Sequence, residues 1–144
     1  MNARSLLDAM IKAARSDVAT CEQIEALLAE QLPALIRRDA DQLTSISQQL
    51  EPLLTRIRTN ARQRAEQLQT LGLNPDQSGM TQLLQRLPAT LATRLRPLWQ
   101  QLEEALRRCR QLNERNGRIL AGQRETIAQL LGETLHNDYS QAAR

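Results

Sequence analysis

Residues 7–40 carry the strongest structural signal in the chain and read LDAMIKAARSDVATCEQIEALLAEQLPALIRRDA. Apolar residues recur there every three or four positions, which is the spacing of one face of an α-helix. The pattern predicts a helix over about residues 2–37. Its apolar stripe consists of Leu7, Met10, Ala14, Val18, Cys21, Ile24, Leu28, Leu32 and Leu35.

Signals for a chain reversal follow this helix. Pro33 lies in the last predicted turn, where we expect it to kink or fray the backbone. Asp39 is a suitable N-cap for a second helix, with Gln42 at the capping-box position. A second apolar stripe then runs up to Gly72, which is placed to end that helix. Because the connection is short, residues 1–71 are expected to form a long antiparallel hairpin that resembles a coiled coil.

Turn-forming residues are concentrated between positions 72 and 80, which predicts a loop. A short helix is expected near 81–87, and a longer one follows, in which Pro97 either bends the helix or starts it afresh. We therefore expect one all-α domain, an elongated three- to four-helix bundle. Its parts are the hairpin 1–71, the loop 72–80, the C-terminal helices 81–131 and a polar tail 132–144.

Composition supports this class. A length of 144 residues fits one domain, and the absence of Phe, with one Trp and one Tyr, leaves Leu, Ile and Ala to build the interior. Trp99 lies just off the third apolar stripe. It either closes the bundle against the hairpin or faces a partner as an anchor.

Several functional classes find no support in the sequence. Cys21 and Cys109 show no metal-ligand spacing and His136 is the only histidine, so no metal is expected and both thiols are read as small core residues. No phosphate-binding loop or catalytic cluster appears, which predicts a protein without enzymatic activity or cofactor. No apolar run suits a signal peptide or a membrane span, so we expect a cytoplasmic protein that does not insert into membranes.

Nucleic acid is a partner to consider, because the net charge is +3 and the pI is about 9.5. The arginines mostly alternate with Glu, Asp and Gln, as on a solvated helix face. Stacking aromatics, which single-strand binding requires, are missing. We therefore expect no nucleic-acid partner.

Residues 113–117 (NERNG) depart from the local pattern, because Asn113 and Asn116 fall on an apolar stripe. Two interpretations stay open. Asn-Gly can end one helix before another begins. Alternatively, the helix continues, a seam Asn fixes the register against a facing helix, and Gly117 lets a backbone approach closely. An apolar face that something must cover follows, formed by Ile119, Leu120, Ile127, Leu130 and Leu131.

The order of these features resembles the FlgN family of flagellar export chaperones over about residues 21–131. The most specific part is the N-x-x-N-G pattern of Asn113, Asn116 and Gly117, followed by Ile119. The other residues that carry the resemblance are Leu28, Glu30, Leu32, Arg38, Asp39, Ala40, Asp41, Leu43, Leu71, Gly72, Leu98 and Trp99.

The resemblance implies a cytoplasmic chaperone that binds the amphipathic C-terminal helical segment of flagellar hook-associated (hook–filament junction) proteins. It also implies delivery of these clients to the flagellar type III secretion gate, with Tyr139 docking to the cytoplasmic domain of that gate. The expected client-binding residues are Asn113, Asn116, Gly117, Ile119, Leu120, Ile127, Leu130 and Leu131.

Two other classes are weighed against the chaperone. A generic coiled-coil adaptor or structural protein would form a stable homo-oligomer that buries the 119–131 face. A nucleic-acid-binding regulatory protein is supported by the pI alone. For the chaperone we expect a monomer or a weak homodimer.

Overall fold

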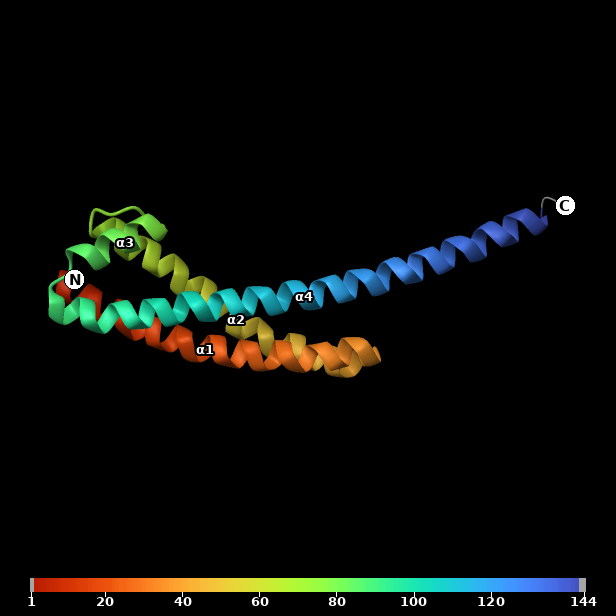
Figure 1. The fold of residues 1–144 in the computed structure, drawn as a ribbon, viewed down its shortest axis with the longest axis horizontal. Coiled ribbons are helices and arrows are strands. Elements are labelled where there is room, and N and C mark those ends of the chain that lie inside the picture. The colour runs from red at the N-terminus through yellow and green to blue at the C-terminus, as the bar shows by residue number, and fades with distance from the viewer. Residues whose placement is uncertain (1, 143–144) are drawn as a thin grey trace.

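The computed structural model describes the backbone of residues 2–142 and the side chains of residues 2–126 and 128–131. Within these residues the chain forms four α-helices and no strand, which confirms the all-α class. The helices are α1 (Ala3–Arg37), α2 (Ala40–Thr70), α3 (Gln77–Arg86) and α4 (Ala89–Ala142). As Figure 1 shows, α1 and α2 form the expected antiparallel hairpin, and α4 runs along α1 in the same direction as α1.

Local hydrogen bonds define where α1 begins. Asn2 is the N-cap, and its Oδ1 accepts a hydrogen bond from the Ser5 N–H over 2.8 Å. The helix continues through Pro33 to Arg37. The helix thus tolerates the missing backbone donor of Pro33 and the crowding of its ring against the preceding turn, and the expected fraying at Pro33 is not observed.

The reversal lies where the sequence predicts it. Arg38 adopts the left-handed conformation (φ 57°, ψ 42°), and the Asp39 N–H donates to the Ala34 carbonyl over 3.0 Å. Asp39 then caps α2, since its side chain accepts a hydrogen bond from the Gln42 N–H over 3.1 Å. The tight connection sets α1 and α2 antiparallel.

The end of α2 also agrees with the prediction. Gly72 has a positive φ of 78°, which costs a residue without a β-carbon little. Its N–H donates to the Gln69 carbonyl, and the Leu73 N–H donates to the Leu68 carbonyl, each over 2.9 Å. This pair of bonds is the Schellman motif, and the buried side chains of Leu68 and Leu73 accompany it.

The helix α3 begins at Gln77, earlier than the sequence prediction near residue 81. Asp76 caps it, accepting hydrogen bonds from the backbone N–H groups of Ser78 (3.1 Å) and Gly79 (3.3 Å). Gly79 was assigned to the predicted loop because glycine usually breaks helices. Here it serves close packing instead, because a β-carbon at Gly79 would lie 1.8 Å from the Asn74 carbonyl oxygen.

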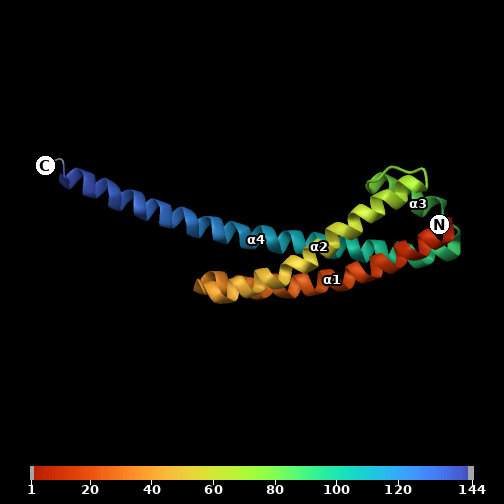
Figure 2. The ribbon, with the colours of Figure 1, turned by 180° about the vertical axis from the view of Figure 1, so that it is seen from behind.

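The helix α4 is continuous from Ala89 to Ala142, with Pro97 inside it. Of the two interpretations of Asn116-Gly117, the uninterrupted helix is therefore the one observed. The backbone stays helical to Ala142, so the helix runs on into the segment 132–144 that the sequence assigns to a polar tail. At 1.5 Å per residue the helix is about 80 Å long. Figures 1 and 2 both show it extending well past the α1–α2 turn.

The core is built around α1, which packs against both α2 and α4. Cys21 (0% exposed) and Cys109 (9% exposed) belong to it as free thiols, which confirms their reading as core residues. The largest fully buried apolar side chains are Ile11, Ile46, Leu68, Met80, Leu95 and Leu102.

Candidate functional site

Three contacts join α4 to α1 at regular intervals. In each pair the two residues are 88 positions apart, and successive pairs advance by seven residues on both helices. This is the heptad spacing of a parallel coiled coil, and we call the row the α1–α4 seam. The contacts are Cys109 Sγ to Cys21 O (3.5 Å), Asn116 Nδ2 to Leu28 O (2.8 Å) and Gln123 Nε2 to Leu35 O (2.7 Å).

Asn116 is the buried polar member of the seam, with 2% of its surface exposed. Its Nδ2 donates to the Leu28 carbonyl and to Gln31 Oε1, each over 2.8 Å. Its Oδ1 accepts from the Arg115 guanidinium over 3.2 Å. The amide is thus satisfied inside the chain. The expected register function of a seam Asn fits this geometry, whereas a surface position for client contact does not.

Asn113 and Gly117 lie elsewhere than expected. Both are exposed, so Asn113 is not part of the apolar stripe to which the sequence assigned it. A β-carbon at Gly117 would meet nothing within 4 Å. The interpretation that Gly117 allows a close backbone approach is therefore wrong.

The predicted apolar face divides into two parts. Ile119 and Leu120 are half-buried beside the seam. Leu130 and Leu131 are 58% and 60% exposed, on the part of α4 beyond the seam. The side chains of Ile127 and Tyr139 lie outside the described residues.

The hairpin is shorter than the helix it supports. The last seam contact joins Gln123 to Leu35, and α1 ends two residues later at Arg37. Residues 124–142 of α4 continue for about 28 Å past that contact, and we call them the α4 extension. Figure 1 shows the α4 extension projecting beyond the α1–α2 turn. Leu130 comes seven residues after Gln123 and so takes the next position of the seam row.

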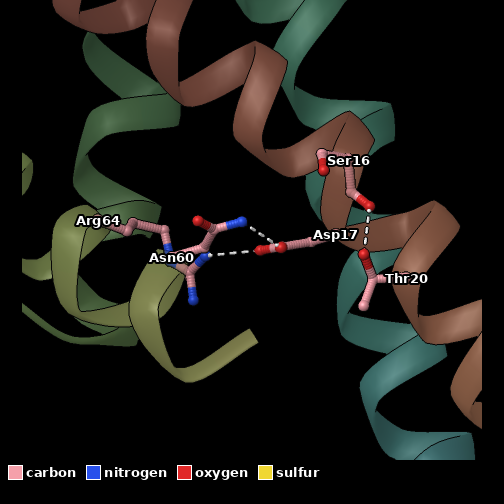
Figure 3. A network of polar contacts seen from close by, with 5 residues as sticks. All are labelled: Ser16, Asp17, Thr20, Asn60 and Arg64. Atoms are coloured by element: carbon pink, nitrogen blue, oxygen red, sulfur yellow. Dashed lines mark hydrogen bonds and ion pairs between the residues drawn. The ribbon is translucent and has the colours of Figure 1, made fainter. Parts of the chain in front are cut away.

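A second polar group ties α2 to α1 (Figure 3). Asp17 is 2% exposed, accepts a hydrogen bond from Asn60 Nδ2 over 2.7 Å, and lies 3.8 Å from Arg64 Nη1. Burial raises the pKa of Asp17, against the opposing effects of Asn60 and the nearby arginines. Burial likewise lowers the pKa of Arg64, and Asp17 offsets this only in part. The two charges are thus incompletely compensated inside the bundle.

Trp99 extends this group to α4. The Arg64 guanidinium lies 4.8 Å from the centre of its ring, and the side chain is 7% exposed. Of the two interpretations of Trp99, closure of the bundle against the hairpin is therefore the one observed. Its Nε1 is buried and has no hydrogen-bond partner among the described residues.

Sequence reasoning missed the group of Asp17, Asn60 and Arg64. A signal for it was present, since Asp17 lies seven residues after Met10 and seven before Ile24, both of which are buried. An acidic residue in a buried heptad row requires a partner. The identity of that partner, on another helix, is not encoded in local spacing.

In the described part of the chain, no group of three or more His, Cys, Asp or Glu residues could hold a metal ion. No helix there is both long and apolar enough to cross a membrane.

Together the features define a class of protein, an elongated helical bundle whose last helix projects beyond its supporting hairpin. The family model of the FlgN protein matches residues 1–137. The chain belongs to the FlgN family, which confirms the resemblance drawn from its sequence and associates it with the flagellum. Among curated proteins, none matches the chain.

A solved structure is also similar. It is the crystal structure of a protein described as flagella synthesis protein FlgN from Pseudomonas aeruginosa, which shares 31% identity with this chain. The likeness covers 77% of this chain and 85% of that one, with a TM-score of 0.66. Family and neighbour thus agree on both the fold and the flagellar association.

Proposed function

We propose that this protein is a cytoplasmic export chaperone for flagellar hook-associated (hook–filament junction) proteins. It binds the amphipathic C-terminal helix of its client and delivers the client to the type III secretion gate. The observation that carries the proposal is the α4 extension, which presents Leu130 and Leu131 more than half exposed beyond the end of α1. Membership of the FlgN family supplies the flagellar context.

The geometry supports binding of a helix. Along the seam, α4 packs against α1 through positions spaced by seven residues, and Leu130 continues that row past Arg37. A client helix laid on the α4 extension takes the place that α1 would occupy if it were longer. Its apolar face then packs on α4 as an amphipathic helix packs in a groove.

The free energies of burial and of ordering indicate how many apolar side chains the client must cover. Burying one leucine side chain contributes about 1.5 to 3 kcal/mol. Ordering a disordered client segment costs roughly 2 to 5 kcal/mol. Leu130 and Leu131 together therefore only about balance the cost of ordering. Further residues must contribute, and Ile119, Leu120 and Ile127 are the proposed additional contacts. Asn116 acts on the client indirectly, by holding α4 in register on α1.

Delivery to the gate is a separate part of the proposal. By its resemblance to the family, Tyr139 docks to the cytoplasmic domain of the export gate. We therefore expect Tyr139→Ala to keep client binding and to slow export, measured as secreted junction protein. Normal export by this variant would remove Tyr139 from the proposed site.

The test of the main proposal is co-purification of the full chain with candidate hook-associated proteins and with their isolated C-terminal helices. We expect both to be retained, and the client-free chain to be a monomer or a weak dimer. A stable homo-oligomer that retains no junction protein would instead indicate a structural adaptor. Retention of the junction proteins without dependence on their C-terminal helices would place the contact elsewhere.

A further inference from the structure

A cleft is lined by residues of α2, α3 and α4. Figure 1 shows α3 at the end of the molecule opposite the α4 extension. The cleft is also bounded by the connection into α3, and it has a volume of about 430 Å³. Such a volume is within the range of roughly 300 to 1,000 Å³ that is usual for ligand sites. The residues that matter here are Arg64, Leu68, Met80, Trp99, Arg107 and Arg110.

The Arg64 side chain in the cleft has unused hydrogen-bond donors. Its guanidinium lies over the Trp99 ring, with Cζ 4.8 Å from the ring centre. The Arg64 side chain is only 21% exposed, and its closest charged contact is the long 3.8 Å approach to Asp17. Arg64 makes no hydrogen bond to any described residue. A guanidinium group can only donate, so a ligand that pairs with Arg64 must supply hydrogen-bond acceptors.

The charges around the cleft favour an anionic ligand. Arg107 and Arg110 line it and are exposed, and no described carboxylate lies within ion-pair distance of either. The lining also holds two acidic residues, so its three arginines, Arg64, Arg107 and Arg110, outnumber the carboxylates. Asp76 accepts the hydrogen bonds that cap α3, and Glu103 accepts one from Gln77 Nε2 over 3.2 Å.

We propose that this cleft binds an acidic peptide segment of a protein partner. One carboxylate of the segment accepts hydrogen bonds from Arg64, while Arg107 and Arg110 attract further acidic residues at the rim. An adjoining apolar side chain of the segment packs on Leu68 and Met80. A carboxylate bound by a guanidinium is a charge-assisted contact and is stronger than a neutral hydrogen bond.

The lining favours a peptide over a nucleic acid. Leu68, Met80 and Leu106 offer no hydrogen-bonding side chain, so a phosphate backbone would leave them uncovered. Asp76 and Glu103 repel any anion close to them, so a ligand with separated acidic residues is favoured over a continuous run of phosphates. A segment that mixes acidic and apolar residues can pair with the arginines and also cover the apolar side chains of the cleft.

This second site goes beyond the proposed client role. Arg110 and Leu131 lie 21 residues apart on α4, which is about 30 Å along one helix axis. A partner in the cleft and a client on the α4 extension can therefore be held at the same time. The two proposals can also be tested independently, because the peptide titration described next contains no hook-associated protein.

The test uses the emission of Trp99, the only tryptophan in the chain. Short blocked peptides drawn at random from Asp, Glu, Leu and Ala are titrated into the full protein. A matched set carries Asn for Asp and Gln for Glu, and oligouridine is the third probe. We expect some acidic peptides to change the emission with micromolar affinity, and the amide set and oligouridine to have no comparable effect.

The variant R107A/R110A should weaken the acidic peptides roughly tenfold while keeping the melting temperature, since both residues are exposed. The control R94A/R118A removes two exposed arginines of α4 that do not line the cleft, and should bind as the unmodified protein does. The proposal is overturned if no acidic peptide binds, if the amide set binds equally well, or if the two variants behave alike. Tighter, arginine-dependent binding of oligouridine would assign the cleft to nucleic acid instead.

Discussion

Asn116 Nδ2 donates a hydrogen bond over 2.8 Å to the backbone carbonyl of Leu28, at the middle of the three contacts that hold α4 on α1. A polar residue in a helix–helix seam usually fixes register at some cost in stability. Here the cost is limited, because both the donor and the acceptor of the amide have partners. The register matters because it determines how much of α4 lies beyond the hairpin.

Asn116→Ala should lower the free energy of unfolding by about 1 to 3 kcal/mol, because it removes the hydrogen bonds that a buried amide makes to the Leu28 carbonyl and to Gln31. Urea denaturation measures this directly. Gln123→Ala is the matched comparison, since it deletes the next contact of the same seam at a part-buried position. We expect a smaller loss there. Equal, negligible losses for both variants would mean that the seam is held by apolar packing alone.

Gly79, which is buried, and Gly117, which is exposed, provide an internal contrast between helical glycines. Gly79→Ala should destabilise the protein by about 1 to 3 kcal/mol, since the new β-carbon would overlap the Asn74 carbonyl oxygen at 1.8 Å. Gly117→Ala should stabilise it by roughly 0.5 to 1 kcal/mol, because it meets no atom within 4 Å and alanine favours the helix. Thermal melts compare the two. A loss of stability in Gly117→Ala would contradict an uninterrupted α4.

Asp17 should make stability depend on pH in a direction opposite to that of most carboxylates. Its folded-state pKa lies above the ordinary value of 3.8, so the folded state binds the proton more tightly than the unfolded state does. The resulting stability is fully present below about pH 4 and is lost as the pH rises through the raised pKa. As the pH rises through that interval, the unmodified protein should therefore lose unfolding free energy relative to Asp17→Asn. A pH-independent difference would contradict the direction of the shift.

Much of the fold could be predicted from sequence because its determinants are local. The cap at Asp39 and the stop at Gly72 depend on residues within a few positions, and periodicity reveals the stripes. Gly79 shows the limit of this reasoning, since its function depends on a carbonyl that only folding brings close. A local turn signal could not distinguish this from a loop.

The candidate site was less predictable than the fold. The unusual pattern at residues 113–117 contains Asn116, which is the buried polar residue of the α1–α4 seam. Sequence alone could not show that Asn116 faces α1 while Asn113 faces solvent, because that depends on which helix lies opposite. The extent of the α4 extension follows from the seam register, which is a relationship between residues 88 positions apart.

The central claim is that the α4 extension binds the C-terminal helix of a hook-associated protein. Isothermal titration of that helix into L130D/L131D tests it, with Leu54→Asp on α2 as a control for an exposed leucine away from the α4 extension. We expect micromolar binding by the unmodified protein and the control. The double variant should bind on the order of a hundredfold more weakly, because two carboxylates then face an apolar surface, while its helical signal and melting temperature are unchanged. Undiminished affinity in a folded L130D/L131D would contradict the claim.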